Sequence, residues 1–98
     1  MSLIDIENEI FRRDILQLLE QDSGYALTEM VLVRALAELG NPIPRARLRA
    51  QLHWLSNQSL VTLGDLAGSG LLTAKLTERG EEVALGVLRA EGVARLPL

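Results

Sequence analysis

The sequence has 98 residues, of which 48% are hydrophobic and 23% are charged, and its formal net charge is −3. This length suits a single domain, and the composition is that of a globular chain rather than a disordered one. Cysteine is absent and histidine occurs once, which excludes disulfides and thiol nucleophiles and argues against a zinc site.

Charge is unevenly distributed along the chain. Residues 1–22 carry a net charge of −4, whereas residues 41–64 carry +3, from Arg45, Arg47 and Arg49 with no acidic residue. No stretch is apolar enough to cross a bilayer, and the acidic N-terminus lacks the basic start of a secretory signal. We therefore expect a cytoplasmic protein, not bound to a membrane, with one concentrated positive segment.

An amphipathic helix is predicted over residues 3–21, within an N-terminal segment 1–22. Ser2 can cap this helix, and Asp5, three residues later, is a weaker form of the capping-box acid. Apolar residues recur at helical spacing, namely Ile4, Phe11, Ile15 and Leu18. Residues 25–27 form a short link or strand.

A helix-turn-helix is predicted over residues 28–58. Thr28 caps a helix that runs to Leu39 and is apolar on two sides, which favours a position between other helices. Pro44 then opens a helix that ends near Asn57. Its expected buried stripe is Leu48, Leu52 and Leu55.

The last third of the chain predicts a β-hairpin followed by a helix. Two β-prone runs flank a glycine-rich turn within residues 60–76. Thr77 then caps a helix over residues 77–92, which Gly92 closes before a short tail. The predicted fold is mainly α with a small β-hairpin, as one domain over residues 1–98.

The order of these elements and three stretches of sequence, residues 41–48, 52–61 and 76–84, resemble the winged helix-turn-helix fold of MarR-, PadR- and ArsR-like regulators. The stretch 86–95 is also similar to small winged-helix proteins of Mu-like prophages. The resemblance implies the order α1-(β1)-α2-α3-β2-β3-α4, with the hairpin as the wing.

The resemblance also implies double-stranded DNA as the partner, with the helix over residues 44–57 in the major groove. Carried over residue by residue, the candidate DNA contacts are Arg45, Arg47, Arg49, His53 and Asn57, with Lys75 on the wing. Two departures stand out. The wing tip at 67–70 carries no basic residue. Ser59 stands where the family often has glycine, and a serine fits this position only if its φ is not positive.

Other interpretations of these residues remain open. The arginines can instead form a solvated helix face that pairs with the acidic first helix of the same or another subunit. His53 can be an ordinary surface residue, and Trp54 is expected under the hairpin, in the core or at its rim. Excess apolar residues on the terminal helices, Ile6, Ile10, Leu16, Leu85 and Leu88, favour a homodimer.

Two functions therefore follow from the sequence. The first is a small transcriptional regulator or prophage-encoded control protein that binds double-stranded DNA as a homodimer, with or without sequence specificity. The second is a winged-helix module for protein–protein interaction in a larger, virion-related assembly, favoured by the acidic balance and the uncharged wing tip. The sequence contains no arrangement of catalytic residues, so we expect neither an enzyme nor a cofactor.

Overall fold

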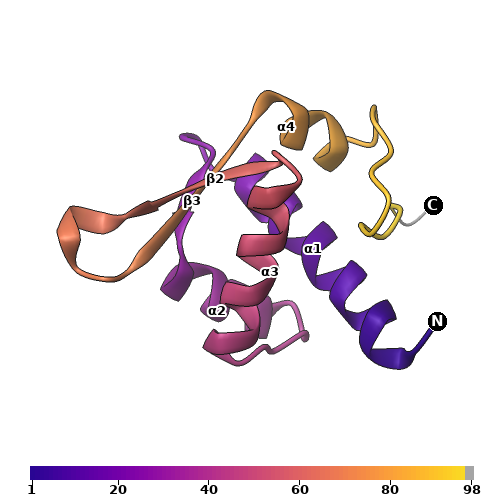
Figure 1. Ribbon diagram of the computed structural model, residues 1–98, viewed down its shortest axis with the longest axis horizontal. Coiled ribbons are helices and arrows are strands. Elements are labelled where there is room, and N and C mark those ends of the chain that lie inside the picture. Colours follow the sequence, from indigo (N-terminus) through magenta and orange to yellow (C-terminus); the bar gives the residue numbers. More distant parts are fainter. Residues whose placement is uncertain (97–98) are drawn as a thin grey trace.

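The computed structural model describes residues 1–96 and contains four α-helices and a small antiparallel sheet (Figure 1). The helices are α1 (Leu3–Gln21), α2 (Glu29–Glu38), α3 (Arg45–Asn57) and α4 (Glu78–Ala84). The strands are β1 (Ala26–Thr28), β2 (Val61–Asp65) and β3 (Leu72–Leu76), and a short 3-10 turn, η1 (Leu66–Gly68), follows β2. Element order agrees with the prediction; the last two residues of the expected domain lie outside the described part.

Local capping signals explain where the first helices begin. The Ser2 hydroxyl accepts a hydrogen bond from the Asp5 amide, and the Asp5 carboxylate accepts one from the Ser2 amide, so the capping box is complete. The Thr28 hydroxyl caps α2 by accepting from the Val31 amide. Gly40 ends that helix region with a φ of +80°.

The three strands form a sheet in the order β1-β3-β2, with antiparallel neighbours. β3 is central, with Lys75 opposite both Ala26 and Thr62. The β2–β3 hairpin extends away from the helices (Figure 1), while its base packs on the core through Val61 and Ala74. The base of the hairpin is thus part of the core, and residues 66–70 at its tip are exposed.

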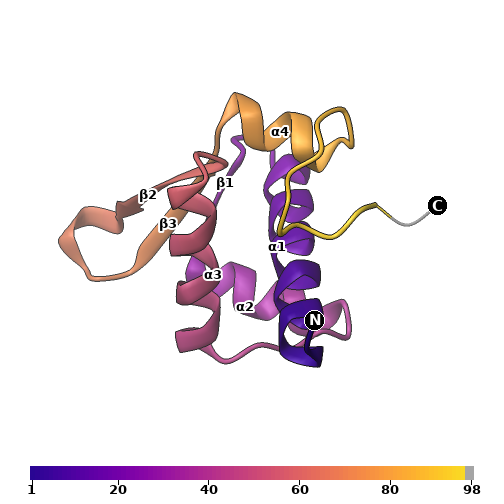
Figure 2. The same ribbon diagram turned by 45° about the vertical axis from the view of Figure 1, so that its right-hand side comes forward.

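One cluster of buried side chains joins the helices and the base of the sheet. α1 and α3 stand on either side of α2, and α4 lies across one end (Figure 2). The predicted stripe of α3 is confirmed, since Leu48, Leu52 and Leu55 are fully buried. Leu16 of α1 is also fully buried, so the expectation that it faces a second subunit is wrong.

α2 lies between α1 and α3, as its two apolar sides predicted, but its second apolar side is only partly buried. Leu32 and Leu36 are buried, whereas Met30, Val31 and Leu39 are exposed. One charged side chain of α2 is also buried, namely Glu29, which exposes none of its surface. Leu32 and Leu36 therefore hold α2 against the core, and Glu29, the first residue of the helix, is buried for its polar contacts.

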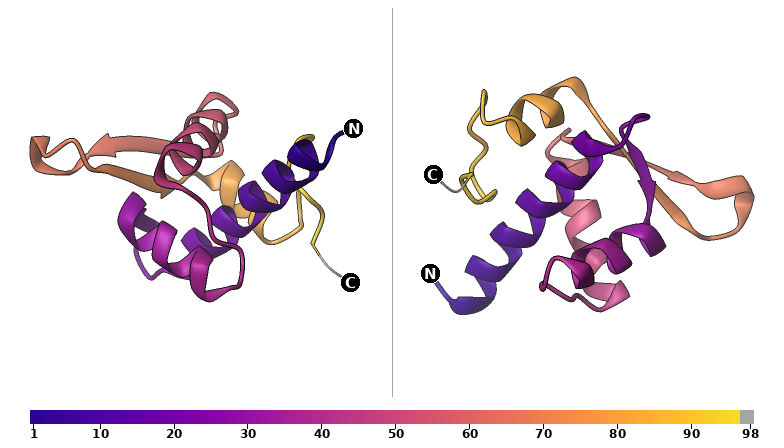
Figure 3. Two further views of the ribbon diagram at one scale, coloured as in Figure 1. Left: turned by 90° about the horizontal axis from the view of Figure 1, so that it is seen from below. Right: turned by 180° about the vertical axis from the view of Figure 1, so that it is seen from behind.

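The predicted C-terminal helix is too long. α4 ends at Ala84 because Gly86 adopts a φ of +80°, which reverses the chain direction after the cap residue Leu85. The segment that follows returns to α1 (Figure 3), where the Ala94 amide donates to the Glu9 carbonyl. Val93 is buried there, so this segment belongs to the core rather than to a terminal helix.

The junctions around the hairpin contain two backbone constraints. Ser59 has a φ of +61°, so it adopts the left-handed conformation that favours glycine, and the condition under which serine fits this position is not met. At Gly80 a Cβ would lie 2.0 Å from the Leu60 carbonyl oxygen, so only glycine lets α4 approach the start of β2 this closely.

None of the helices described is long and apolar enough to cross a membrane.

Candidate nucleic-acid interface

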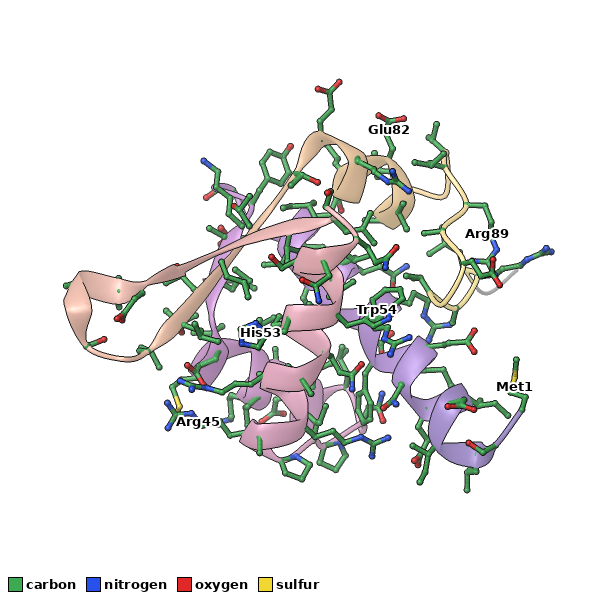
Figure 4. The ribbon with its side chains drawn as sticks, in the orientation of Figure 1. Met1, Arg45, His53, Trp54, Glu82 and Arg89 are labelled. Atoms are coloured by element: carbon green, nitrogen blue, oxygen red, sulfur yellow. The ribbon has the colours of Figure 1, made fainter. Side chains whose placement is uncertain are left out.

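α3 presents a small, polar surface opposite its buried stripe. Ala46, Ala50, His53 and Asn57 are all exposed and recur at helical spacing. Figure 4 shows His53 on the side of α3 that faces the hairpin and Trp54 on the side that faces α1. The short alanine side chains leave the helix backbone accessible to a large partner such as a DNA groove.

Arg45 and Arg49 lie at one edge of this surface, and both bind the buried carboxylate of Glu29. The Nε atoms of Arg45 and Arg49 donate to the same oxygen, Glu29 Oε1, at 2.6 and 2.8 Å. Nη2 of Arg49 also donates to Oε2 at 2.8 Å, which makes that pair bidentate. One carboxylate therefore neutralises half of the charge of the two arginines.

The same carboxylate connects α2 and α3 with the hairpin. The Leu72 amide donates to Glu29 Oε2 at 2.5 Å, and Nη2 of Arg49 donates to the Gly70 carbonyl at 2.7 Å. Asp65 accepts from the Gly70 amide, closing the turn. Three elements thus meet at Glu29, and the hairpin is held at a defined position relative to α3.

These contacts determine the ionisation of Glu29. Hydrogen bonds from Arg49 and Arg45 hold the pKa of the Glu29 carboxyl far below its usual range, although burial acts in the opposite direction. The same pairing raises the pKa of the Arg49 guanidinium. Glu29 therefore stays charged at all physiological pH values, and the network persists with it.

The two arginines nevertheless keep hydrogen-bond donors for another partner. A guanidinium has five N–H groups. Within residues 1–96, Arg45 uses only Nε, and its side chain is 51% exposed. Arg49 uses Nε and Nη2 and is 37% exposed, which leaves Nη1 outside any hydrogen bond among these residues.

Arg47 lies on the opposite edge of α3 and faces α1. It donates to Asn8 Oδ1 and to Glu7, and its guanidinium carbon lies 5.0 Å from the centre of the Phe11 ring. Gln51, which is buried, continues this polar contact by donating to Asn8 and accepting from Arg12. Pairing between the arginines and the acidic first helix, one of the open alternatives, thus occurs at Arg47.

The remaining candidates are dispersed. Lys75 is exposed on β3 between the buried residues Ala74 and Leu76, so it points to the sheet face away from the core. We expected Trp54 under the hairpin, in the core or at its rim; it does pack at the rim of the core, but away from the hairpin. Its ring packs against the Arg12 guanidinium at 3.9 Å and against Gly92, near α1 and the C-terminal segment. There, burial lowers the pKa of Arg12.

Sequence reasoning missed Glu29 because its position has a simpler explanation. An acid directly after a capping threonine is typical of a helix N-terminus, where the helix dipole favours negative charge. The sequence around the arginines gave no contrary signal, because Glu38 and Asp65 lie nearer to that segment than Glu29 does. Among residues 1–96, no group of acidic or histidine side chains is arranged to hold a metal ion.

Comparison with known proteins finds a relative in a bacteriophage. It is 38% identical over 91 residues to gp26 of Escherichia phage Mu, an uncharacterized protein, covering 93% of this chain and 92% of gp26. No protein-family model matches the chain.

The fold is similar to that of RosR from H. salinarum, solved from crystals grown with NaBr. The TM-score is 0.67 at 26% identity over 76% of this chain and 66% of RosR. Two RosR complexes, S4 and S1, match with the same TM-score over 63% and 64% of their chains, so the likeness covers slightly less than two thirds of RosR. With the observed element order, it confirms the winged-helix fold, in which β2–β3 is the wing. The likeness to MarR, PadR or ArsR regulators stays a prediction.

Proposed function

Since the chain belongs to the family of phage Mu gp26 and has a winged-helix fold, we propose that it binds double-stranded DNA as a small transcriptional regulator. α3 enters the major groove with its Ala46, Ala50, His53 and Asn57 surface, and Arg45 and Arg49 contact phosphates or guanine at the edge. The role is binding without catalysis, in the cytoplasm where the DNA lies.

One observation carries this proposal. The solvent-facing side of α3 combines small residues, which permit close approach, with two partly exposed guanidinium groups whose outer N–H groups are unused within residues 1–96. The likeness to RosR, including its two complexes, supports it at the level of the fold. Because Glu29 and Glu7 offset part of the arginine charge, we expect few phosphate contacts and a shallow salt dependence.

The experiment is a salt-titrated binding assay on duplex fragments flanking the protein's own gene, with a random duplex of equal length. Arg45→Glu should abolish binding, whereas Arg34→Glu is the matched control, because Arg34 is 81% exposed on α2 and makes the same change in charge. Equal affinity of wild type and Arg45→Glu refutes the proposal.

Self-association is part of the proposal, because two-fold dimers match paired half-sites. Exposed aliphatic side chains remain on α1, in Leu3, Ile4 and Ile6, and directly after α4, in Leu85. Mass measurement in solution tests this, and a monomer at the concentrations that saturate DNA contradicts it.

A second function is favoured by a specific observation, since the wing tip at residues 67–70 carries no cation and three arginines of α3 have acidic partners. Such a surface suits a protein partner in a phage assembly. A pull-down from lysate treated with nuclease separates the two functions, because a DNA-mediated partner is lost and a direct protein partner is retained.

A further inference from the structure

We propose that Glu29 is the positioning residue of the DNA-binding surface, holding Arg45 and Arg49 as a rigid fork and fixing the wing beside them. This inference rests on the proposed function and deepens it. Glu29 touches no DNA in this arrangement, because it is fully buried, and it acts entirely through the two guanidinium groups and the Leu72 amide.

The geometry of the fork follows from a shared acceptor. Both Nε atoms bond to Oε1 of Glu29, at 2.6 Å from Arg45 and 2.8 Å from Arg49. The distance between the two Nε atoms is therefore no more than the sum of these two bond lengths, so the guanidinium groups lie close together. Two cations at such a separation repel each other without the carboxylate between them. Glu29 holds Arg49 through Nε and Nη2 and Arg45 through Nε, which leaves Nη1 of Arg49 and both terminal nitrogens of Arg45 without a hydrogen bond among residues 1–96.

The wing is set by the same group. Leu72 begins β3, its amide binds Glu29, and Arg49 binds the Gly70 carbonyl just before it. A wing with no basic residue at its tip gains little from being mobile and searching for phosphates. A fixed wing, by contrast, keeps one conformation beside α3, so the partner binds a surface whose shape is already set.

A positioning role and simple neutralisation make opposite predictions for Glu29→Gln. The substitution removes one negative charge beside the DNA, so electrostatics alone predict tighter binding and a steeper salt dependence. Loss of positioning predicts weaker binding, by about tenfold, because donors that had been fixed must be ordered on binding. The sign of the change therefore separates the two roles.

The experiment compares wild type, Glu29→Gln and the control Glu38→Gln on the duplex that the wild type binds most tightly. Glu38 is an exposed acid of α2, paired only with Arg34 among the described residues, so its substitution changes charge without touching the fork. Circular dichroism first establishes that each variant is folded. About tenfold weaker binding by Glu29→Gln alone supports the proposal, and equal or tighter binding overturns it while leaving DNA binding intact.

A second measurement uses only the wild-type chain and does not depend on the stability of a variant. The Nε–H resonances of Arg45 and Arg49 should be resolved and slow to exchange in free protein, and should stay so when the duplex is added. If DNA makes them exchange rapidly, the arginines leave Glu29 to bind DNA, and the positioning role is wrong. If the wild type binds no duplex at all, the proposed function fails, and this inference fails with it.

Discussion

Replacing Glu29 by glutamine should destabilise the fold by an amount that depends on pH. The carboxylate accepts four hydrogen bonds, from Nε of Arg45, Nε and Nη2 of Arg49, and the Leu72 amide. Each carboxylate oxygen accepts two of these bonds, whereas glutamine has one oxygen and one NH2 group. In either orientation of the amide, two of the four donors therefore face the NH2 group and lose their acceptor. At about 1.5 kcal/mol for each lost bond to a charged group, the loss is about 3 kcal/mol at pH 7.

The pH dependence follows from the sign of the pKa shift. The pKa of Glu29 is lowered in the folded state, so its contribution is fully present above the unfolded-state pKa of about 4.3 and decreases as the pH falls below that value. The decrease is about 1.4 kcal/mol for each pH unit. The difference in free energy of unfolding between wild type and Glu29→Gln should therefore fall from about 3 kcal/mol at pH 7 to about 1.2 kcal/mol at pH 3.

Urea unfolding followed by circular dichroism at both pH values measures this difference, with equal m-values showing that the unfolded states are comparable. Glu38→Gln is the control, because its exposed ion pair with Arg34 contributes little at any pH. A gap between wild type and Glu29→Gln that is the same at pH 3 and pH 7 refutes the reasoning, since the stabilisation would then not depend on the ionised carboxylate.

Three further predictions concern other parts of the molecule. Gly80→Ala should lower the free energy of unfolding by about 1–3 kcal/mol or more, because the new Cβ collides with the Leu60 carbonyl; a thermal melt that matches wild type contradicts this. Ser59→Gly should raise the melting temperature, because it relieves a φ of +61°, and a lower one would show that the Ser59 side chain matters more. Asn57→Ala should reduce discrimination between duplexes without changing the salt slope, as expected of a base contact rather than a phosphate contact, and a reduced slope would reassign it.

Much of the fold was predictable because its determinants are local. Capping at Ser2 and Thr28, the proline before α3 and the turn-forming glycines act within a few residues, and the structure places the first three helices at those signals. α4 was predicted too long because its apolar ladder continues past Ala84. Gly86 follows helical residues directly, and the tertiary contacts of Val93 with the core decide in favour of a turn.

The site was predictable only in part, because side-chain pairing is not local. The sequence correctly places arginines on both edges of α3. It does not show that Glu29 reaches Arg45 and Arg49 from 16 and 20 residues away, nor that Arg47 meets Asn8 across 39. Those contacts depend on how α1 and α2 cross α3, which is set by core packing rather than by charge.

Glu29 also bears on the choice between the two functions, because they make different demands on it. A surface for a protein partner needs the hairpin and α3 to keep their shape, and any group that joins them with satisfied hydrogen bonds serves that purpose. A DNA-binding surface needs in addition that positive charge remains after the joint is made, and two arginines on one carboxylate leave a charge of +1 at the edge of α3. An arrangement of one arginine and one glutamate would have joined the same elements with no charge left over. The second arginine is therefore the feature that points toward a polyanion, and Arg45, the more exposed of the two, is the residue whose reversal tests it most directly.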